Sequence, residues 1–192
     1  MSVYEHKSYI KWCQTIRISK EDWSFYCFVP FQCSNDVKLR WFQYRLLHRI
    51  IPTNKYLHLI KVTASDKCEF CHEYIETIEH LFYYCTYSAD IWNNVQTLLN
   101  NAGGINIVIK DVSTVLFGAK FARQLNLIIL LIKSFIFNCK LQKIIPRQNK
   151  IIMFLKDYFI LQKKILFGNM RGIEWGKHWL PWYYFLQFST IF

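Results

Sequence analysis

The sequence predicts a mainly α-helical protein, and three observations support this. Apolar residues recur at helical spacing in several stretches that end at proline, glycine or asparagine. Hydrophobic residues make up 53% of the chain, enough for a core that needs no disulfides. One short segment carries three cysteines and a histidine at spacings that suit a single metal ion. Together these features predict a small zinc-stapled helical domain followed by a basic helical extension.

Residues 1–36 are predicted to be an N-terminal extension, with four basic and four acidic residues. The first ten residues are polar and lack the apolar segment of a secretory signal. Seven cysteines are an odd number, and those outside the metal motif form no disulfide framework: Cys13, Cys27, Cys33 and Cys139. This usage favours a reducing, intracellular location, in the nucleus or the cytoplasm.

The next segment, residues 38–51, is predicted to be a helix that stops at Pro52. Its apolar stripe should face the core and consists of Leu39, Phe42, Leu46 and Ile50. Thr53 is expected to cap a short second helix over residues 54–60. The apolar residues of that second helix should pack on the first, and they are Tyr56, Leu57 and Ile60.

A second stripe on the first of these helices is basic and aromatic. At about 100° per residue, its basic side chains lie close to one indole ring. Basic groups beside an indole can bind phosphates and stack on a base. A solvated basic face with Trp41 packed on a neighbour is equally typical of this pattern. The candidate nucleic-acid contacts, with one residue from the second helix, are Lys38, Trp41, Arg45, His48, Arg49 and Lys55.

The metal motif is Cys68, Cys71, His80 and Cys85, in the order C-x2-C-x8-H-x4-C. Three thiolates and an imidazole form the tetrahedral set of a structural zinc ion and leave no position for a substrate. The site should therefore hold a shape rather than catalyse. Two alternatives remain: buried free cysteines beside an incidental histidine, or His72 as the fourth ligand. His80 is preferred because His72 directly follows Cys71 and would form a cramped pair.

Residues 77–85 are expected to begin a helix, with Glu76 and Glu79 near the positive end of its dipole. A spacing of five between His80 and Cys85 does not suit a straight helix. The chain should therefore bend or unwind near Cys85.

The net charge of +11 is unevenly distributed. Residues 37–61 carry six basic and no acidic residues, and residues 112–192 carry twelve basic and two acidic ones. The segment between them, which holds the metal motif, has seven acidic and two basic residues. Basic flanks indicate a polyanionic partner such as RNA or DNA, whereas the acidic metal loop should serve as scaffold.

Residues 90–99 are predicted to form a helix that ends at the Asn-Asn-Ala-Gly-Gly stretch, the clearest break in the chain. A short extended piece within residues 105–117 and two helices, over about residues 120–145 and 149–167, should follow. The predicted segments are thus 37–104 for the zinc-binding domain, 105–171 for the basic helical region and 172–192 for an aromatic tail. The tail is either a stacking surface or an arbitrary extension of the reading frame.

The most apolar stretch, residues 125–139, has an unbroken apolar run of only six residues. A membrane span needs about 20 predominantly apolar residues. A buried amphipathic helix is therefore expected, and no membrane partner.

The chain resembles a known family. The run from Lys38 to Lys55, followed by Cys-Glu-Phe-Cys and Glu-Thr-Ile-Glu-His-Leu-Phe-Tyr-Tyr-Cys, is similar to the zinc-binding domain after the reverse transcriptase in LINE-type (non-LTR) retrotransposon polyproteins. The resemblance covers about residues 23–95. It implies a zinc module that helps the polymerase engage template RNA or target DNA, with Cys68, Cys71, His80 and Cys85 as ligands.

The chain departs from such polyproteins by truncation. The Tyr-x-Asp-Asp turn of a polymerase is absent, because Asp90 in Tyr-Ser-Ala-Asp is followed by Ile91. No endonuclease-like cluster of carboxylates is visible either. The chain alone is therefore not expected to be an enzyme. A second hypothesis is a structural module that docks on the reverse transcriptase body, and the oligomeric state is left open.

Overall fold

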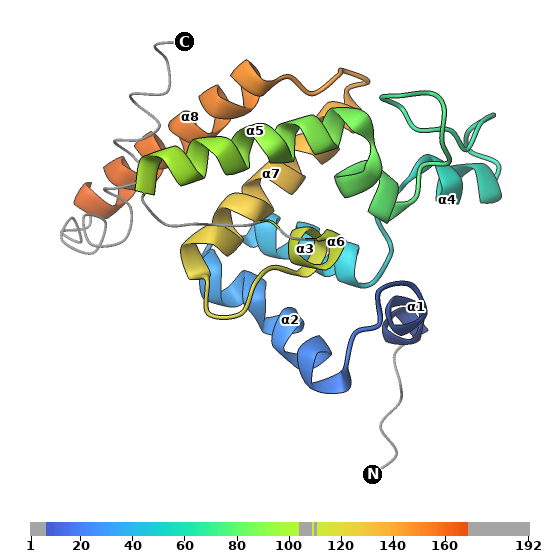
Figure 1. The fold of residues 1–192 in the computed structure, drawn as a ribbon, viewed down its shortest axis with the longest axis horizontal. Helices are drawn as coiled ribbons and strands as arrows, with labels where there is room; N and C mark the ends of the chain where they lie inside the picture. The colour runs from blue at the N-terminus through green and yellow to red at the C-terminus, as the bar shows by residue number, and fades with distance from the viewer. Residues whose placement is uncertain (1–6, 104–108, 110, 169–192) are drawn as a thin grey trace.

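A computed structural model describes residues 7–103, 109 and 111–168 of the chain (Figure 1). The described part is mainly α, as predicted, and contains only one isolated β-bridge, between Lys67 and Ile75. Its elements are α1 (Lys7–Ile16), α2 (Lys20–Cys33), α3 (Val37–Leu47), α4 (Asn54–Leu59), the π-helical turn η1 (His80–Tyr84), α5 (Thr86–Gly103), α6 (Val112–Phe117), α7 (Arg123–Leu141) and α8 (Gln148–Gly168). The predicted aromatic tail, residues 172–192, lies outside the described residues.

Helices α1 and α2 belong to the core, although the sequence suggested an extension there. Trp12 of α1 is fully buried, and its Nε1 donates a hydrogen bond to the carbonyl oxygen of Leu47 at 2.8 Å. The Trp12 ring also meets Phe117 edge-on at 5.1 Å. Ser19 caps α2 by accepting a hydrogen bond from the backbone N–H of Asp22. A burial of this extent ties the first two helices to the rest of the fold.

Helix α3 is shorter than predicted. Its N-cap is Asp36, and it ends at Leu47 because Arg49 adopts a left-handed backbone with φ of 55°. The turn rotates the chain, so that Ile51 is buried while Ile50 is 52% exposed. The prediction that Ile50 belongs to the core stripe is therefore wrong. The other three stripe residues are buried as predicted: Leu39, Phe42 and Leu46.

Helix α4 begins at Asn54, after Thr53, as predicted, but the Thr53 side chain makes no capping hydrogen bond. Tyr56 and Ile60 are each 47% exposed, so the prediction that they pack on the preceding helix is wrong. In Figure 1, α4 and the loop that follows it lie at the end of the molecule opposite α8. This exposed position leaves one face of α4 open to a partner.

The chain between residues 100 and 117 departs from the expected ranges. Helix α5 runs past residue 99 and ends at Gly103, within the Asn-Asn-Ala-Gly-Gly stretch that was expected to end it. Residues 112–117 form helix α6, and most of the other positions at which a short extended piece was expected lie outside the described residues. Asp111 caps α6 by accepting a hydrogen bond from the Thr114 backbone N–H at 2.8 Å.

Helix α7 is the central element and packs against α2, α3, α8 and η1. It is long and apolar enough to cross a membrane, but 67% of its most apolar window is buried inside the protein. The core helix of a globular protein meets the same criteria. One hydrophobic cluster runs from Trp12 to Phe159, and so includes side chains from the first three predicted segments.

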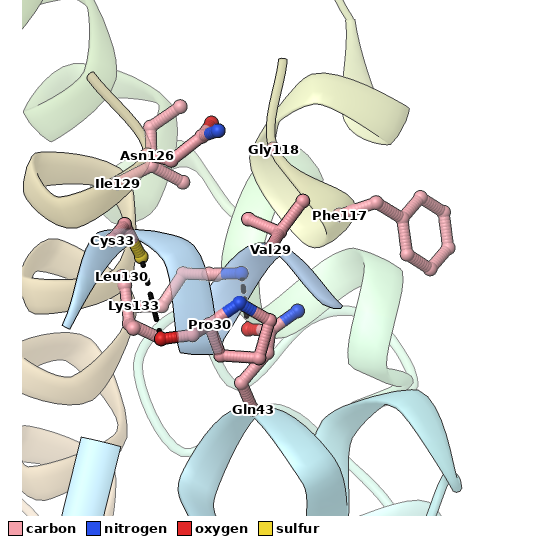
Figure 2. Close-up of a pocket in the computed structure, with 10 residues that line it drawn as sticks. All are labelled: Val29, Pro30, Cys33, Gln43, Phe117, Gly118, Asn126, Ile129, Leu130 and Lys133. Carbon is pink, nitrogen blue, oxygen red and sulfur yellow. Dashed lines mark hydrogen bonds between the residues drawn. The ribbon is translucent and has the colours of Figure 1, made fainter. Parts of the chain in front are cut away.

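A polar cluster interrupts this core between α2, α3 and α7 (Figure 2). The Lys133 ammonium donates to Gln43 Oε1 and to the Leu116 carbonyl oxygen, both at 2.7 Å. Gln43 Nε2 donates to the same carbonyl at 2.8 Å. Burial lowers the pKa of Lys133 to about 7, whereas burial raises the pKa of the nearby Cys33 thiol to about 11. Lys133 is therefore a titratable group on the buried side of α7.

Candidate metal centre

The first two predicted ligands lie on a tight loop that the isolated bridge closes. Cys68 donates its backbone N–H to Tyr74 across the loop at 2.8 Å. His72 donates its N–H to the Cys68 carbonyl at 3.0 Å, which folds the chain back between the two cysteines. A turn of this kind directs both sulfurs toward one point.

The other two ligands are brought together by the π-helical turn η1. At 100° per residue, two positions five apart on an α-helix would point roughly 140° away from each other. In η1 the Cys85 N–H instead bonds to the His80 carbonyl at 2.8 Å, five residues back, and Cys85 leaves the turn with extended backbone angles. The expected unwinding near Cys85 is confirmed, since a π-turn is how the chain accommodates the spacing.

The four ligand atoms lie within 4.8 Å of one another. The sulfurs of Cys68 and Cys85 are 3.8 Å apart, and Cys71 Sγ lies 3.4 Å from His80 Nε2. Zinc bonds of about 2.3 Å to sulfur and 2.0–2.1 Å to nitrogen give tetrahedral edges of roughly 3.8 Å (S–S) and roughly 3.5 Å (S–N). The donor set and both separations therefore fit a tetrahedral zinc ion.

Local electrostatics favour the protonation states that a zinc ion requires at His80 and Cys85, but not at Cys68. Burial lowers the pKa of His80, which keeps its imidazole neutral and able to ligate. A hydrogen bond from Cys68 lowers the pKa of Cys85, and the N–H groups of Tyr87 and Ser88 at the start of α5 act in the same direction. The same hydrogen bond raises the pKa of Cys68. A divalent cation would remove this competition for one proton by stabilising both thiolates.

His72, the competing ligand, is exposed and lies outside the cluster. Its φ of 57° is a left-handed conformation that is strained for a residue with a Cβ. His72 therefore serves as the turn residue of the loop, and His80 occupies the fourth position of the cluster.

A buried carboxylate that no sequence pattern indicated organises this loop. Glu76 is fully buried, and its two oxygens accept backbone N–H groups from Asn54 at 2.8 Å and Glu69 at 2.9 Å. It thus caps α4 in place of Thr53. Lys140 of α7 lies 3.5 Å from Glu76 and donates to the Pro52 carbonyl at 2.6 Å. The pair connects the metal loop to the central helix.

A second contact connects the metal centre to α1. Arg49 forms an ion pair at 2.9 Å with Glu79, the residue before the ligand His80. The guanidinium also lies 3.9 Å from the centre of the Trp12 ring. Arg49 therefore has a structural role, which the prediction of a free basic stripe on one helix did not include.

The remaining predicted nucleic-acid contacts separate into different places. Lys38 and Trp41 are exposed on α3, and Trp41 stacks on Tyr44 with ring centres 5.1 Å apart. The His48 ring lies 4.1 Å from that of Tyr44, which extends the stack. The half-buried Arg45 instead directs its guanidinium toward Phe137, 5.9 Å away. The exposed part of this face is therefore more aromatic than the sequence suggested.

Lys55 lies apart from these residues, on α4. It is exposed, and its backbone N–H bonds to the Glu76 carbonyl. Lys55 and Arg49 both line a groove between α1 and α4. The six predicted contacts thus form no single continuous stripe.

Comparison with known proteins is consistent with the metal centre. No curated protein matches the chain. Residues 4–92, a little under half of the chain, match a family model, and this segment holds all four ligands together with helices α1 to α4. The match begins well before the residue 37 boundary of the predicted domain. The matched family is described as zinc-binding in reverse transcriptase, an accessory rather than a catalytic domain.

Proposed function

We propose that this chain is a zinc-stabilised nucleic-acid-binding module of a LINE-type retrotransposon reverse transcriptase. It helps the polymerase to engage template RNA or target DNA and has no catalytic role of its own. The observation that carries the proposal is a closed Cys3His cluster inside a segment that matches the reverse transcriptase zinc-binding family. With four protein ligands the zinc ion would have no position for water or substrate, so it would supply structure.

The charge and the exposed aromatic rings support nucleic acid as the partner. A net charge of +11 attracts a polyanion, and association with phosphates releases counterions. Trp41 and Tyr44 are 55% and 45% exposed, and their rings are inclined by only 9°. Exposed stacked rings beside Lys38 resemble the platforms on which unpaired bases stack.

Substitution of Trp41 by alanine tests the proposal. The zinc-loaded Trp41→Ala chain should bind single-stranded RNA or DNA about 5- to 150-fold more weakly, because one base-stacking contact is lost. Phe121→Ala is the matched control. The Phe121 side chain is an aromatic ring that is 98% exposed, and it lies between α6 and α7 rather than on α3. Fluorescence anisotropy across a salt titration measures both variants. Failure of the zinc-loaded wild-type chain to bind nucleic acid at low salt would contradict the proposal.

A docking role on the polymerase body is the second candidate. Phe28 and Phe31, nearly one turn apart on α2, are 63% and 59% exposed. Exposed aromatic side chains of this kind anchor protein interfaces. Binding to a purified reverse transcriptase body that is lost in a Phe28→Ala/Phe31→Ala variant would favour this role.

A further inference from the structure

The structure has a cationic groove between α1 and α4, next to the metal loop. Its volume is about 310 Å³, and its walls come from α1, the segment between α3 and α4, α4 itself and the segment before η1. None of the described residues that line it is acidic. Three are cations: Lys11, Arg49 and Lys55.

Two of these cations are free to meet an outside anion. Lys11 and Lys55 are exposed, and neither forms an ion pair within the described part of the chain. Arg49 differs, because its ion pair with Glu79 and its contact with Trp12 fix the wall of the groove. The groove therefore presents two exposed ammonium groups beside a wall that Arg49 holds in place through its ion pair with Glu79, the residue before His80.

The rim of the groove adds surfaces for a base. Tyr56 is 47% exposed and Leu59 is 77% exposed, both on α4. An apolar or aromatic rim beside paired cations matches single-stranded nucleic acid, in which a base and its phosphate are presented together. A volume near the lower end of the range for ligand sites suits one nucleotide unit.

We infer that this groove binds the backbone phosphate of single-stranded RNA or DNA through Lys11 and Lys55, with a base against Tyr56. The inference rests on the proposed nucleic-acid function and assigns it a second contact region, separate from the exposed face of α3. Two such regions would hold a strand at two points along its length.

The test compares two double variants of the zinc-loaded full chain. Lys11→Gln/Lys55→Gln removes the two groove ammonium groups, and Lys150→Gln/Lys164→Gln removes the same charge from exposed positions on α8. The probe is a fluorescein-labelled oligodeoxythymidine of about 15 nucleotides, which spans one binding site. Zinc content and circular dichroism establish that each variant is folded.

The groove variant should bind the probe more weakly, with a slope of log K against log salt that is about 0.7 smaller, since the single-strand phosphate held by the two lysines contributes about 0.7. The α8 variant should keep the wild-type slope to within about 0.3.

An unchanged slope in the groove variant, with the wild type still binding, would overturn this inference but not the proposed function. Displacement of the probe by millimolar inorganic phosphate would also overturn it, because the groove would then be a small-anion site. Absence of probe binding by the wild type would overturn the proposed function as well.

Discussion

At the residue scale, single side chains in this protein carry more than one role. Arg49 ends α3, contacts Trp12 and pairs with Glu79, so the residue that changes the direction of the chain also fixes α1 beside the metal loop. The sequence indicates a basic residue at this position but not its partners. The partners are separated from it by tens of residues, and no local pattern encodes such a contact.

Lys133 provides a prediction on pH. Its folded-state pKa of about 7 is below the ordinary 10.5, so between these values the unfolded chain binds one more proton than the folded chain. The free energy of unfolding should therefore rise with pH above about 7. The stability gained in this way is lost again as the pH falls toward 7, where the folded chain also binds the Lys133 proton. Relative to Lys133→Met, the free energy of unfolding of the wild type should increase by up to about 1.4 kcal/mol per pH unit between about pH 7 and pH 9.

Urea unfolding of both proteins at several pH values in this range measures the difference. The folded-state pKa of Cys33, about 11, lies above this range, and the loss of the Lys133 charge would raise it further, so the Cys33 thiol stays protonated in both folded proteins. Parallel pH profiles for the two proteins would show that Lys133 keeps an ordinary pKa in the folded state.

At the scale of elements, the junction of α4, the metal loop and α7 depends on one buried ion pair. Glu76→Ala should destabilise the fold by about 3–5 kcal/mol, because it leaves the Lys140 ammonium buried without a counter-charge. Glu73→Ala is the matched control on the same loop. The Glu73 side chain is exposed, so a change within about 0.5 kcal/mol is expected.

A double-mutant cycle measures the interaction between the two side chains. Chemical denaturation gives the free energy of unfolding of the zinc-loaded wild type, Glu76→Ala, Lys140→Met and the double variant. The double variant should lose less stability than the sum of the two single ones, because removing both charges leaves no isolated buried ion. Strict additivity would mean that the two side chains do not interact.

The elements that sequence periodicity predicted best are those with a continuous apolar stripe. Helices α7 and α8 lie close to the expected ranges, and Ile91, Trp92 and Val95 of α5 are buried as helical spacing requires. Errors concentrate where tertiary contacts override local preference, as at the end of α3. The cap of α6 is different, since an aspartate directly before the apolar residues of a helix, as Asp111 is, is a local N-cap signal that was present in the sequence.

At the scale of the whole molecule, the candidate metal cluster was predictable and its support was not. Spacing and ligand chemistry predict Cys68, Cys71, His80 and Cys85 as ligands without any knowledge of the fold, and the structure brings these four side chains together. The carboxylate of Glu76 and the ammonium of Lys140 meet only because α7 crosses behind the loop, 64 positions further along the chain. Long-range packing of this kind also makes helices α1 and α2 part of the same core as α7.

The central claim is that one zinc ion holds the two halves of the metal loop together. Elemental analysis of the full chain, purified under reducing and chelator-free conditions, tests it most directly. The wild type and His72→Gly should each carry one zinc ion, because His72 is only a strained turn residue, whereas Cys85→Ser should lose the metal and most of its thermal stability. A wild-type chain that is fully folded and contains no zinc would contradict the account.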